Sequence, residues 1–208
     1  MGECKPMYTI VVGPELSINQ GEGNLLTKPD TQHYQSVVGS AMYLAQVSRY
    51  DILYGVNQLT RAMSNASKAH IGATQTPTPL PHRQHRFRHN IQARGFKLTV
   101  FSDANWGNNP DNGKSTLSYV MMMCNGPVSF KVGMQGHTAQ STMLAELVAA
   151  ALVMKEVIYL AGMMEELGFE ETFKRVPIHI DNTSALHVAG TRPTARVRTM
   201  WLADYSTF

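Results

Sequence analysis

The succession of strand-like and helix-like runs between residues 95 and 190 constrains the fold more than any other feature of this sequence. Three apolar runs of strand length come first, a single long run with helical spacing follows, and a short strand-like run precedes a short helical run. This order indicates an α/β fold with a mixed sheet. We predict a three-stranded meander within residues 95–136, a helix at Ser141–Leu167, a strand at Val176–Asp181 and a short helix at Ser184–Ala189.

Turn and cap residues mark the boundaries of these elements. Asn125–Gly126 is a pair typical of a tight β-hairpin, and turn formers fill residues 108–113 between the first two strands. Gly168 stands where a left-handed glycine would end the long helix. Asn182 or Thr183 would cap the short helix that follows.

Three acidic residues stand at the predicted ends of these elements. Asp103 ends the strand-like run that begins at Lys97, Glu146 lies near the start of the long helix, and Asp181 ends the strand-like run that begins at Val176. Strand ends and helix starts collect site residues in α/β folds, and carboxylates are the ligands that Mg²⁺ prefers. We therefore predict that the three carboxylates converge and hold two divalent cations, an arrangement suited to phosphodiester cleavage.

Each acid also has a plainer interpretation when it is taken alone. Asp103 would then be a solvent-facing turn residue, Glu146 a first-turn acid favoured by the helix dipole, and Asp181 the N-cap of the next helix. The set of three, in this order and at these element ends, favours the metal site.

The motifs resemble the ribonuclease H domain of copia-type retrotransposon polyproteins and the end of the reverse transcriptase that precedes it. The resemblance covers residues 1 to about 73 and 95 to about 190. In the ribonuclease H part it rests on Phe101–Trp106 (FSDANW), Lys114–Tyr119, Gly126–Lys131, Ala139–Val148 (AQSTMLAELV) and His179–Leu186 (HIDNTSAL). In the reverse transcriptase part it rests on Tyr34–Leu44 and Arg49–Leu59.

The resemblance implies a ribonuclease H-like domain at residues 96–190 that hydrolyses the RNA strand of RNA–DNA hybrids as a two-metal endonuclease. Asp103, Glu146 and Asp181 would be the catalytic residues and the ligands of Mg²⁺ or Mn²⁺. Lys114, Ser115 and His137 are further candidates for contact with the substrate. The partners implied are the hybrid and the adjoining reverse transcriptase.

Residues 1–73 are predicted to be the C-terminal remnant of the reverse transcriptase. An irregular lead-in, residues 1–33, is rich in Gly, Pro and Asn, and two helices follow within residues 34–64. Asp51 is a plausible N-cap for the second helix. The first helix carries an apolar stripe of Val37, Val38, Met42, Tyr43, Leu44 and Val47.

Residues 74–95 are predicted to be a basic, proline-rich linker. Alternate prolines within Thr76–Pro81 exclude helix, and a basic run follows at His82–His89. Such a run would track a phosphate backbone, or be a solvated linker, or record a disrupted reading frame. We favour the third, because codons for Thr74–Gly95 read one base later can spell the leucine-rich helix that the family has here.

Residues 191–208 are predicted to be a divergent tail, so the domain is expected to be C-terminally incomplete. The flanking residues do not match the family, and Asp204 is not selected as a fourth acid for that reason. Without a fifth strand, Val176–Asp181 would leave an unpaired sheet edge, and we expect an unstable or aggregation-prone chain.

Composition excludes some classes of protein. The net charge of +3 does not by itself indicate a nucleic-acid binder. We expect no membrane span, because no apolar run approaches the roughly 18 residues that a span needs. Cys4 and Cys124 show no disulfide or metal-ligand spacing. We expect an intracellular protein. Two other functions remain open besides the nuclease: a decayed, catalytically inactive retrotransposon fragment, and a nucleic-acid-binding module that holds a hybrid without cleaving it.

Overall fold

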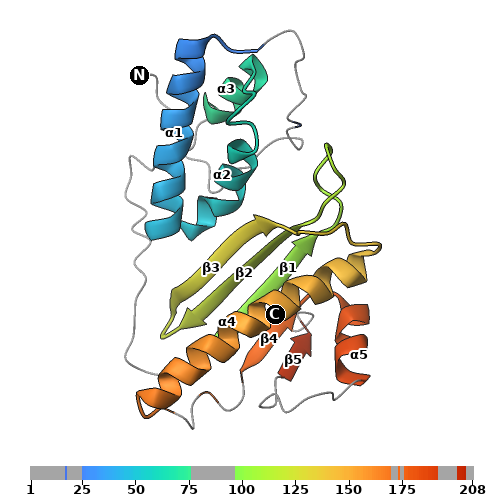
Figure 1. The fold of residues 1–208 in the computed structure, drawn as a ribbon. Coiled ribbons are helices and arrows are strands. Elements are labelled where there is room, and N and C mark those ends of the chain that lie inside the picture. Colours follow the sequence, from blue (N-terminus) through green and yellow to red (C-terminus); the bar gives the residue numbers. More distant parts are fainter. Residues whose placement is uncertain are drawn as a thin grey trace. The chain divides into compact units, whose positions relative to one another are not determined.

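The computed structural model describes residue 17 and residues 25–75, 97–169, 173, 176–191 and 201–204 (Figure 1). The chain divides into two units, a helical unit and an α/β unit. Most of the predicted linker at residues 74–95 lies outside the described residues. Its first two residues belong to a helix, because α3 (Lys68–Gln75) extends to Gln75.

The first helix of the helical unit, α1 (Lys28–Val47), begins within the stretch predicted to be irregular. Thr27 is its N-cap and accepts a hydrogen bond from the backbone N–H of Asp30 at 3.5 Å. Pro29 in the first turn needs no intrahelical partner for its nitrogen, and Asp30 suits the positive end of the helix dipole. These capping signals outweigh the high content of loop-forming residues just before them.

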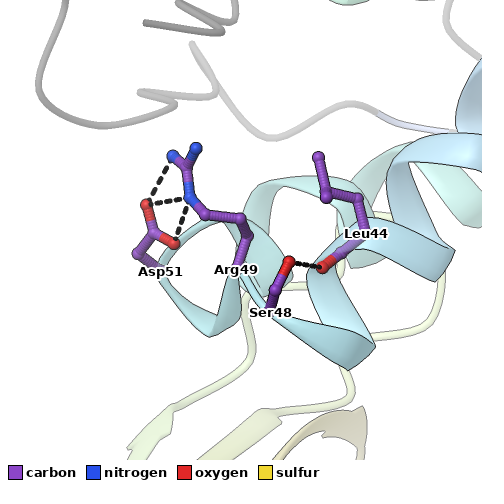
Figure 2. A network of polar contacts seen from close by, with 4 residues as sticks. All are labelled: Leu44, Ser48, Arg49 and Asp51. Carbon is purple, nitrogen blue, oxygen red and sulfur yellow. Dashed lines mark hydrogen bonds and ion pairs between the residues drawn. The ribbon is translucent and has the colours of Figure 1, made fainter. Parts of the chain in front are cut away.

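The chain between α1 and the next helix is held by polar contacts of Ser48, Arg49 and Asp51 (Figure 2). The Arg49 guanidinium donates to both carboxylate oxygens of Asp51, with Nε–Oδ1 and Nη2–Oδ2 distances of 2.8 Å. The prediction that Asp51 is a helix N-cap is therefore wrong. Asp51 lies in the 3₁₀ turn η1 (Tyr50–Ile52), and its carboxylate binds the preceding arginine instead of a backbone N–H.

Packing in the helical unit buries only part of the apolar stripe predicted for α1, namely Val38, together with Tyr34 from outside the stripe. Tyr34 and Val38 are buried with Leu59, which lies in α2 (Leu53–Thr60), and with Ala66. The Tyr34 hydroxyl donates to the Leu59 carbonyl at 2.8 Å, which satisfies a buried polar group. Val37, Tyr43 and Val47, assigned to the stripe from sequence, are exposed.

The α/β unit contains a five-stranded sheet in the order β3-β2-β1-β4-β5. The meander β1-β2-β3 is antiparallel, whereas β4 runs parallel to β1 and β5 parallel to β4. The strands are β1 (Thr99–Asn105), β2 (Thr116–Met123), β3 (Gly126–Met134), β4 (Pro177–Ile180) and β5 (Trp201–Asp204).

The hairpin between β2 and β3 turns one residue earlier than predicted. Cys124 and Asn125 have φ values of 53° and 64°, so they are the two central residues of the turn, and Gly126 begins β3. A tight hairpin of this kind needs two left-handed residues, and Asn tolerates that conformation better than most residues.

The long predicted helix is confirmed as α4 (Thr142–Glu166), which lies across the sheet (Figure 1). Gly168 follows it with φ of 86°, as predicted for a glycine that ends a helix. Its inward residues pack on alternate residues of β1, β2 and β4. The main core cluster includes Val153, Val157, Ala161 and Met164 of α4 and Val100, Tyr119, Met121, Ile178 and Ile180 of the sheet.

The expectation that no apolar run approaches the length of a membrane span is wrong for α4, which is long and apolar enough to cross a membrane by length and composition alone. A core helix of a globular domain has the same properties, and the inward face of α4 packs against the sheet. Only 33% of the apolar stretch is buried, so α4 also presents apolar residues to solvent.

The expectation that the sheet ends at its fourth strand is wrong. β5 pairs with β4 from Pro177–Trp201 to Ile180–Asp204, and α5 (Thr183–Thr191) connects the two strands. Four residues in extended conformation suffice to pair with β4. β4 is therefore an inner strand, which removes the reason given for an exposed edge there.

We predict that Ile178→Ala destabilises the α/β unit strongly, because Ile178 is completely buried in β4. Truncation of a buried isoleucine costs about 2–5 kcal/mol. The matched control is Ile158→Ala, at an α4 residue that is 54% exposed, and it should change the free energy of unfolding by less than about 0.5 kcal/mol. Urea unfolding followed by circular dichroism measures both, and equal effects would contradict this core.

A candidate metal centre of three carboxylates

Two of the three acids are brought together by the parallel pairing of β1 with β4. Val100 lies opposite Ile178 and Phe101 opposite His179. Asp103 and Asp181 each come two residues after the Phe101–His179 pair, so the register places them side by side at the carboxyl end of the two strands. Asp103 does not end its strand as predicted, because β1 continues to Asn105.

Glu146 reaches the same place from the second turn of α4. Ser141 caps the helix by accepting a hydrogen bond from the Leu144 N–H at 3.2 Å. No acid lies in the first turn of α4, so Glu146 is not the dipole-favoured residue of the plainer interpretation. Its Oε1 accepts a hydrogen bond from the Ala104 N–H at 3.2 Å, next to Asp103.

Buried polar contacts fix the start of α4 against the sheet. The Gln135 side chain donates to the carbonyl of Ala145 at 2.8 Å, and the Gln135 backbone N–H donates to the Ser115 carbonyl at 2.8 Å. The Trp106 indole donates to the carbonyl of Ala139 at 2.8 Å, just before the helix. These contacts hold the residue beside Glu146 in a defined position relative to β2.

The three carboxylates converge as the sequence predicts. One ligand oxygen from each of Asp103, Glu146 and Asp181 lies within 4.8 Å of the others. Glu146 is only 5% exposed, whereas Asp103 and Asp181 face solvent. Glu146 Oε2 is buried and has no hydrogen-bond partner among the described residues. A buried carboxylate oxygen without a donor is unfavourable unless a cation or a proton satisfies it.

Burial and mutual repulsion raise the pKa values of Glu146 and Asp103. Burial raises the pKa of Glu146 to about 7, and the nearby charges of Asp103 and Asp181 add to the rise. The Ala104 N–H opposes it by stabilising the carboxylate. The pKa of Asp103 is also raised, first by desolvation and then by repulsion from Asp181. A bound cation would relieve both causes, so the residues present fit a divalent metal.

Asn182 resolves one of the alternatives for Asp181. The Asn182 side chain accepts a hydrogen bond from the Ala185 N–H at 3.0 Å and therefore caps α5. Because Asn182 has this role, the plainer interpretation of Asp181 as the N-cap is not needed. The sequence already indicated this, because Asn182, a residue type that often caps helices, directly follows Asp181.

The three candidates for substrate contact lie in different environments. Ser115 is fully buried, and its Oγ accepts a hydrogen bond from the Gly107 N–H at 3.1 Å. This contact holds the β1–β2 connection together and does not fit the predicted exposure of Ser115 to substrate. Lys114 is half-buried and His137 is exposed, and their contact with substrate stays a prediction.

Asp204 is placed near the same edge of the sheet by β5. Its backbone lies opposite Ile180, the residue before Asp181. The flanking residues of Asp204 do not reveal this position, because it depends on the pairing of β5 with β4. The signal that was present is an acid at the end of a short apolar run, Trp201–Asp204.

The chain is similar to Pol polyproteins along most of its length. It is 30% identical over 189 residues, 89% of its length, to the retrovirus-related Pol polyprotein from transposon RE1 of Arabidopsis thaliana. It is 29% identical over 199 residues, 91% of its length, to that from transposon TNT 1-94 of Nicotiana tabacum. The chain spans only 12% and 14% of these relatives, and no family model matches it.

Among solved structures, the chain is similar to LC11-RNase H1 in complex with an RNA/DNA hybrid. The two share 12% identity and a TM-score of 0.37, over 52% of this chain and 84% of that one. Because this similarity is low, we describe the α/β fold from the strand order and connections of its own sheet.

We predict that the metal-free protein loses stability as the pH rises from about 4.5 to about 7. The folded state holds a proton on Glu146 in this window and the unfolded state does not. A rise in pKa from 4.5 to about 7, at 1.36 kcal/mol per unit, corresponds to roughly 3 kcal/mol at most. Urea unfolding in the presence of a chelator measures the slope.

The variant Glu146→Gln should flatten this slope and be more stable than the parent above pH 7. Glu166→Gln, at an exposed residue of the same helix, is the matched control and should keep the parent slope. A parent protein whose stability rises between pH 4.5 and pH 7 would contradict the raised pKa of Glu146.

Proposed function

The chain is a homologue of the Pol polyproteins of copia-type retrotransposons and contains a ribonuclease H-like domain, and we propose that this domain is a metal-dependent nuclease. It would bind two divalent cations at Asp103, Glu146 and Asp181 and hydrolyse the RNA strand of RNA–DNA hybrids. The observation that carries the proposal is the convergence of the three carboxylates at one edge of the sheet.

The donor set favours Mg²⁺ or Mn²⁺. All three side chains offer oxygen, and no histidine or cysteine joins the cluster among the described residues. Hard oxygen ligands suit these cations, and Mg²⁺ retains several waters, so three carboxylates and substrate phosphate oxygens suffice. When bound, the paired cations activate a water molecule and stabilise the leaving oxygen.

The protein residues would act by position and charge. Asp103 and Asp181 lie on neighbouring strands of a hydrogen-bonded sheet, so their separation is held by the backbone. Glu146 has a pKa of about 7 and must lose its proton before it can bind a cation, so cation binding should strengthen as the pH rises through this value. Its Oε1 is oriented by the Ala104 N–H, which leaves Oε2 for the cation.

The similarity to Pol polyproteins supports the proposed substrate and partners. A ribonuclease H-like domain would recognise the hybrid by its helical shape and 2′-hydroxyls. Residues 1–73 would be the end of an adjoining reverse transcriptase, and an intracellular location fits both activities.

We predict that the protein cleaves the RNA strand of a labelled RNA–DNA hybrid only with Mg²⁺ or Mn²⁺ present. Asp103→Asn, Glu146→Gln and Asp181→Asn should each reduce cleavage to the level seen with chelator, because an amide keeps the shape but loses the charge that binds the cation. Gel analysis of the products measures the rate. Glu166→Gln, outside the cluster, should cleave like the parent protein.

Binding data separate the alternatives to this function. An inactive retrotransposon remnant would neither bind cations nor cleave, and a non-cleaving module would bind the hybrid in fluorescence anisotropy without producing fragments. Cleavage that persists in Asp103→Asn would show that the site is wrong or that another nuclease is present.

We also predict that Mg²⁺ raises the melting temperature more at pH 8 than at pH 6. Binding to the folded state alone stabilises it by mass action, and a protonated Glu146 competes with the cation. Differential scanning calorimetry measures the shift. Glu146→Gln should remove most of the shift at both pH values, and an equal shift in this variant would place the cation elsewhere.

A further inference from the structure

Trp106 presents an aromatic ring to solvent beside the carboxylate cluster. It directly follows the last residue of β1 and stands three residues after Asp103. Three residues of extended chain span at most about 11 Å, so the Cα atoms of the two residues lie no further apart than that. The Trp106 side chain is 47% exposed, although tryptophan is highly buried on average in folded domains.

The orientation of the indole is fixed by its own N–H. Nε1 donates to the carbonyl of Ala139 at 2.8 Å, and Ala139 is itself buried. Ala139 belongs to a small core cluster with Ala104 and Ala145, which joins β1 to the start of α4. The polar group of the Trp106 side chain is thus satisfied by the protein, and the ring surface that stays exposed is apolar.

The two segments joined by this hydrogen bond also carry two of the three acids. Asp103 precedes Trp106 on the β1 side. Glu146 lies seven residues after Ala139, and its carboxylate accepts from the Ala104 N–H. A duplex whose phosphate reaches these carboxylates covers the surface around them. At a rise of about 3.4 Å per base pair, about 11 Å corresponds to roughly three base pairs.

We propose, resting on the proposed function, that Trp106 binds the hybrid by packing its exposed ring against sugars next to the cleaved bond. The bases of a duplex are stacked on one another, whereas the wide, shallow minor groove of an A-form helix displays its sugars. Phosphates and base edges call for hydrogen-bonding groups, and the Trp106 N–H is already used. A flat apolar ring suits the carbon face of a sugar, so Trp106 adds an apolar contact to a site built from charge.

Such a contact affects substrate binding more than the chemical step, because it is the same in the ground state and in the transition state. Trp106→Ala should therefore raise KM for a labelled RNA–DNA hybrid about tenfold and change kcat less than about threefold. Tyr159→Ala, at an α4 residue that is 70% exposed, is the control and should keep the parent KM. Thermal unfolding by circular dichroism shows that each variant is folded.

Trp106→Phe separates contact with substrate from support of the fold. Phenylalanine keeps an aromatic ring but loses the N–H that binds Ala139. If the ring contacts the hybrid, this variant should recover most of the affinity that Trp106→Ala loses. If the hydrogen bond alone matters, both variants should be impaired equally, and that result would overturn the proposal.

Acrylamide quenching of fluorescence tests the contact directly. The chain has two tryptophans, so in Trp201→Phe the emission comes from Trp106. Asp103→Asn is added to prevent cleavage, and it also removes one negative charge near the phosphates. The quenching constant should fall about twofold or more when the hybrid is bound, with saturation followed by fluorescence anisotropy. An indole that stays equally accessible in the complex would contradict the contact.

The outcomes for the contact and for the nuclease are distinguishable. A parent chain that cleaves, together with a Trp106→Ala variant that has the parent KM, would leave the nuclease in place and refute the contact. A parent chain that does not cleave, together with a hybrid that shields Trp106 from acrylamide, would refute the nuclease and support the contact. A parent chain that neither binds nor cleaves the hybrid would refute both.

Discussion

The parallel pairing of β1 with β4 is the interaction on which the rest of the α/β unit depends. It sets Asp103 beside Asp181, because parallel neighbours end at the same edge of a sheet. It also requires the chain to cross the sheet between β3 and β4, and α4 makes that crossing. The crossing brings Glu146, in the second turn of α4, to the Ala104 N–H on β1. The core and the carboxylate cluster are therefore two results of one strand pairing.

The carboxylate cluster opposes the stability that the core provides. Burial gives Glu146 a pKa of about 7, and Oε2 of the same side chain has no donor among the described residues. A structural acid would be satisfied by backbone N–H groups or by a basic partner, as Asp51 is by Arg49. An acid held near two other acids stores electrostatic free energy that a cation can release. This difference between Asp51 and Glu146 is the physical argument for a metal-binding role.

Helix α4 packs one side on the sheet and exposes the other to solvent. Its composition alone does not show which side is buried. Apolar residues surround much of its circumference, so helical periodicity gives no clear inward direction. The sheet decides it: Val153, Val157 and Ala161 are buried, whereas Leu152, Tyr159 and Met163 remain exposed. The exposed residues form an apolar surface on the part of α4 that faces away from the sheet.

The sequence by itself determined the order of the elements from β1 to α5, the extent of α4, the glycine that ends it and the three acids. These features depend on local spacing and capping, which are written in neighbouring residues. Tertiary structure decided which face of α1 is buried, that Arg49 rather than a helix start holds Asp51, that Ser115 is buried, and that Trp201–Asp204 extends the sheet. These outcomes depend on side-chain contacts or on backbone pairing formed in the folded chain. The residue pattern of a four-residue strand is too short to predict which strand it pairs with.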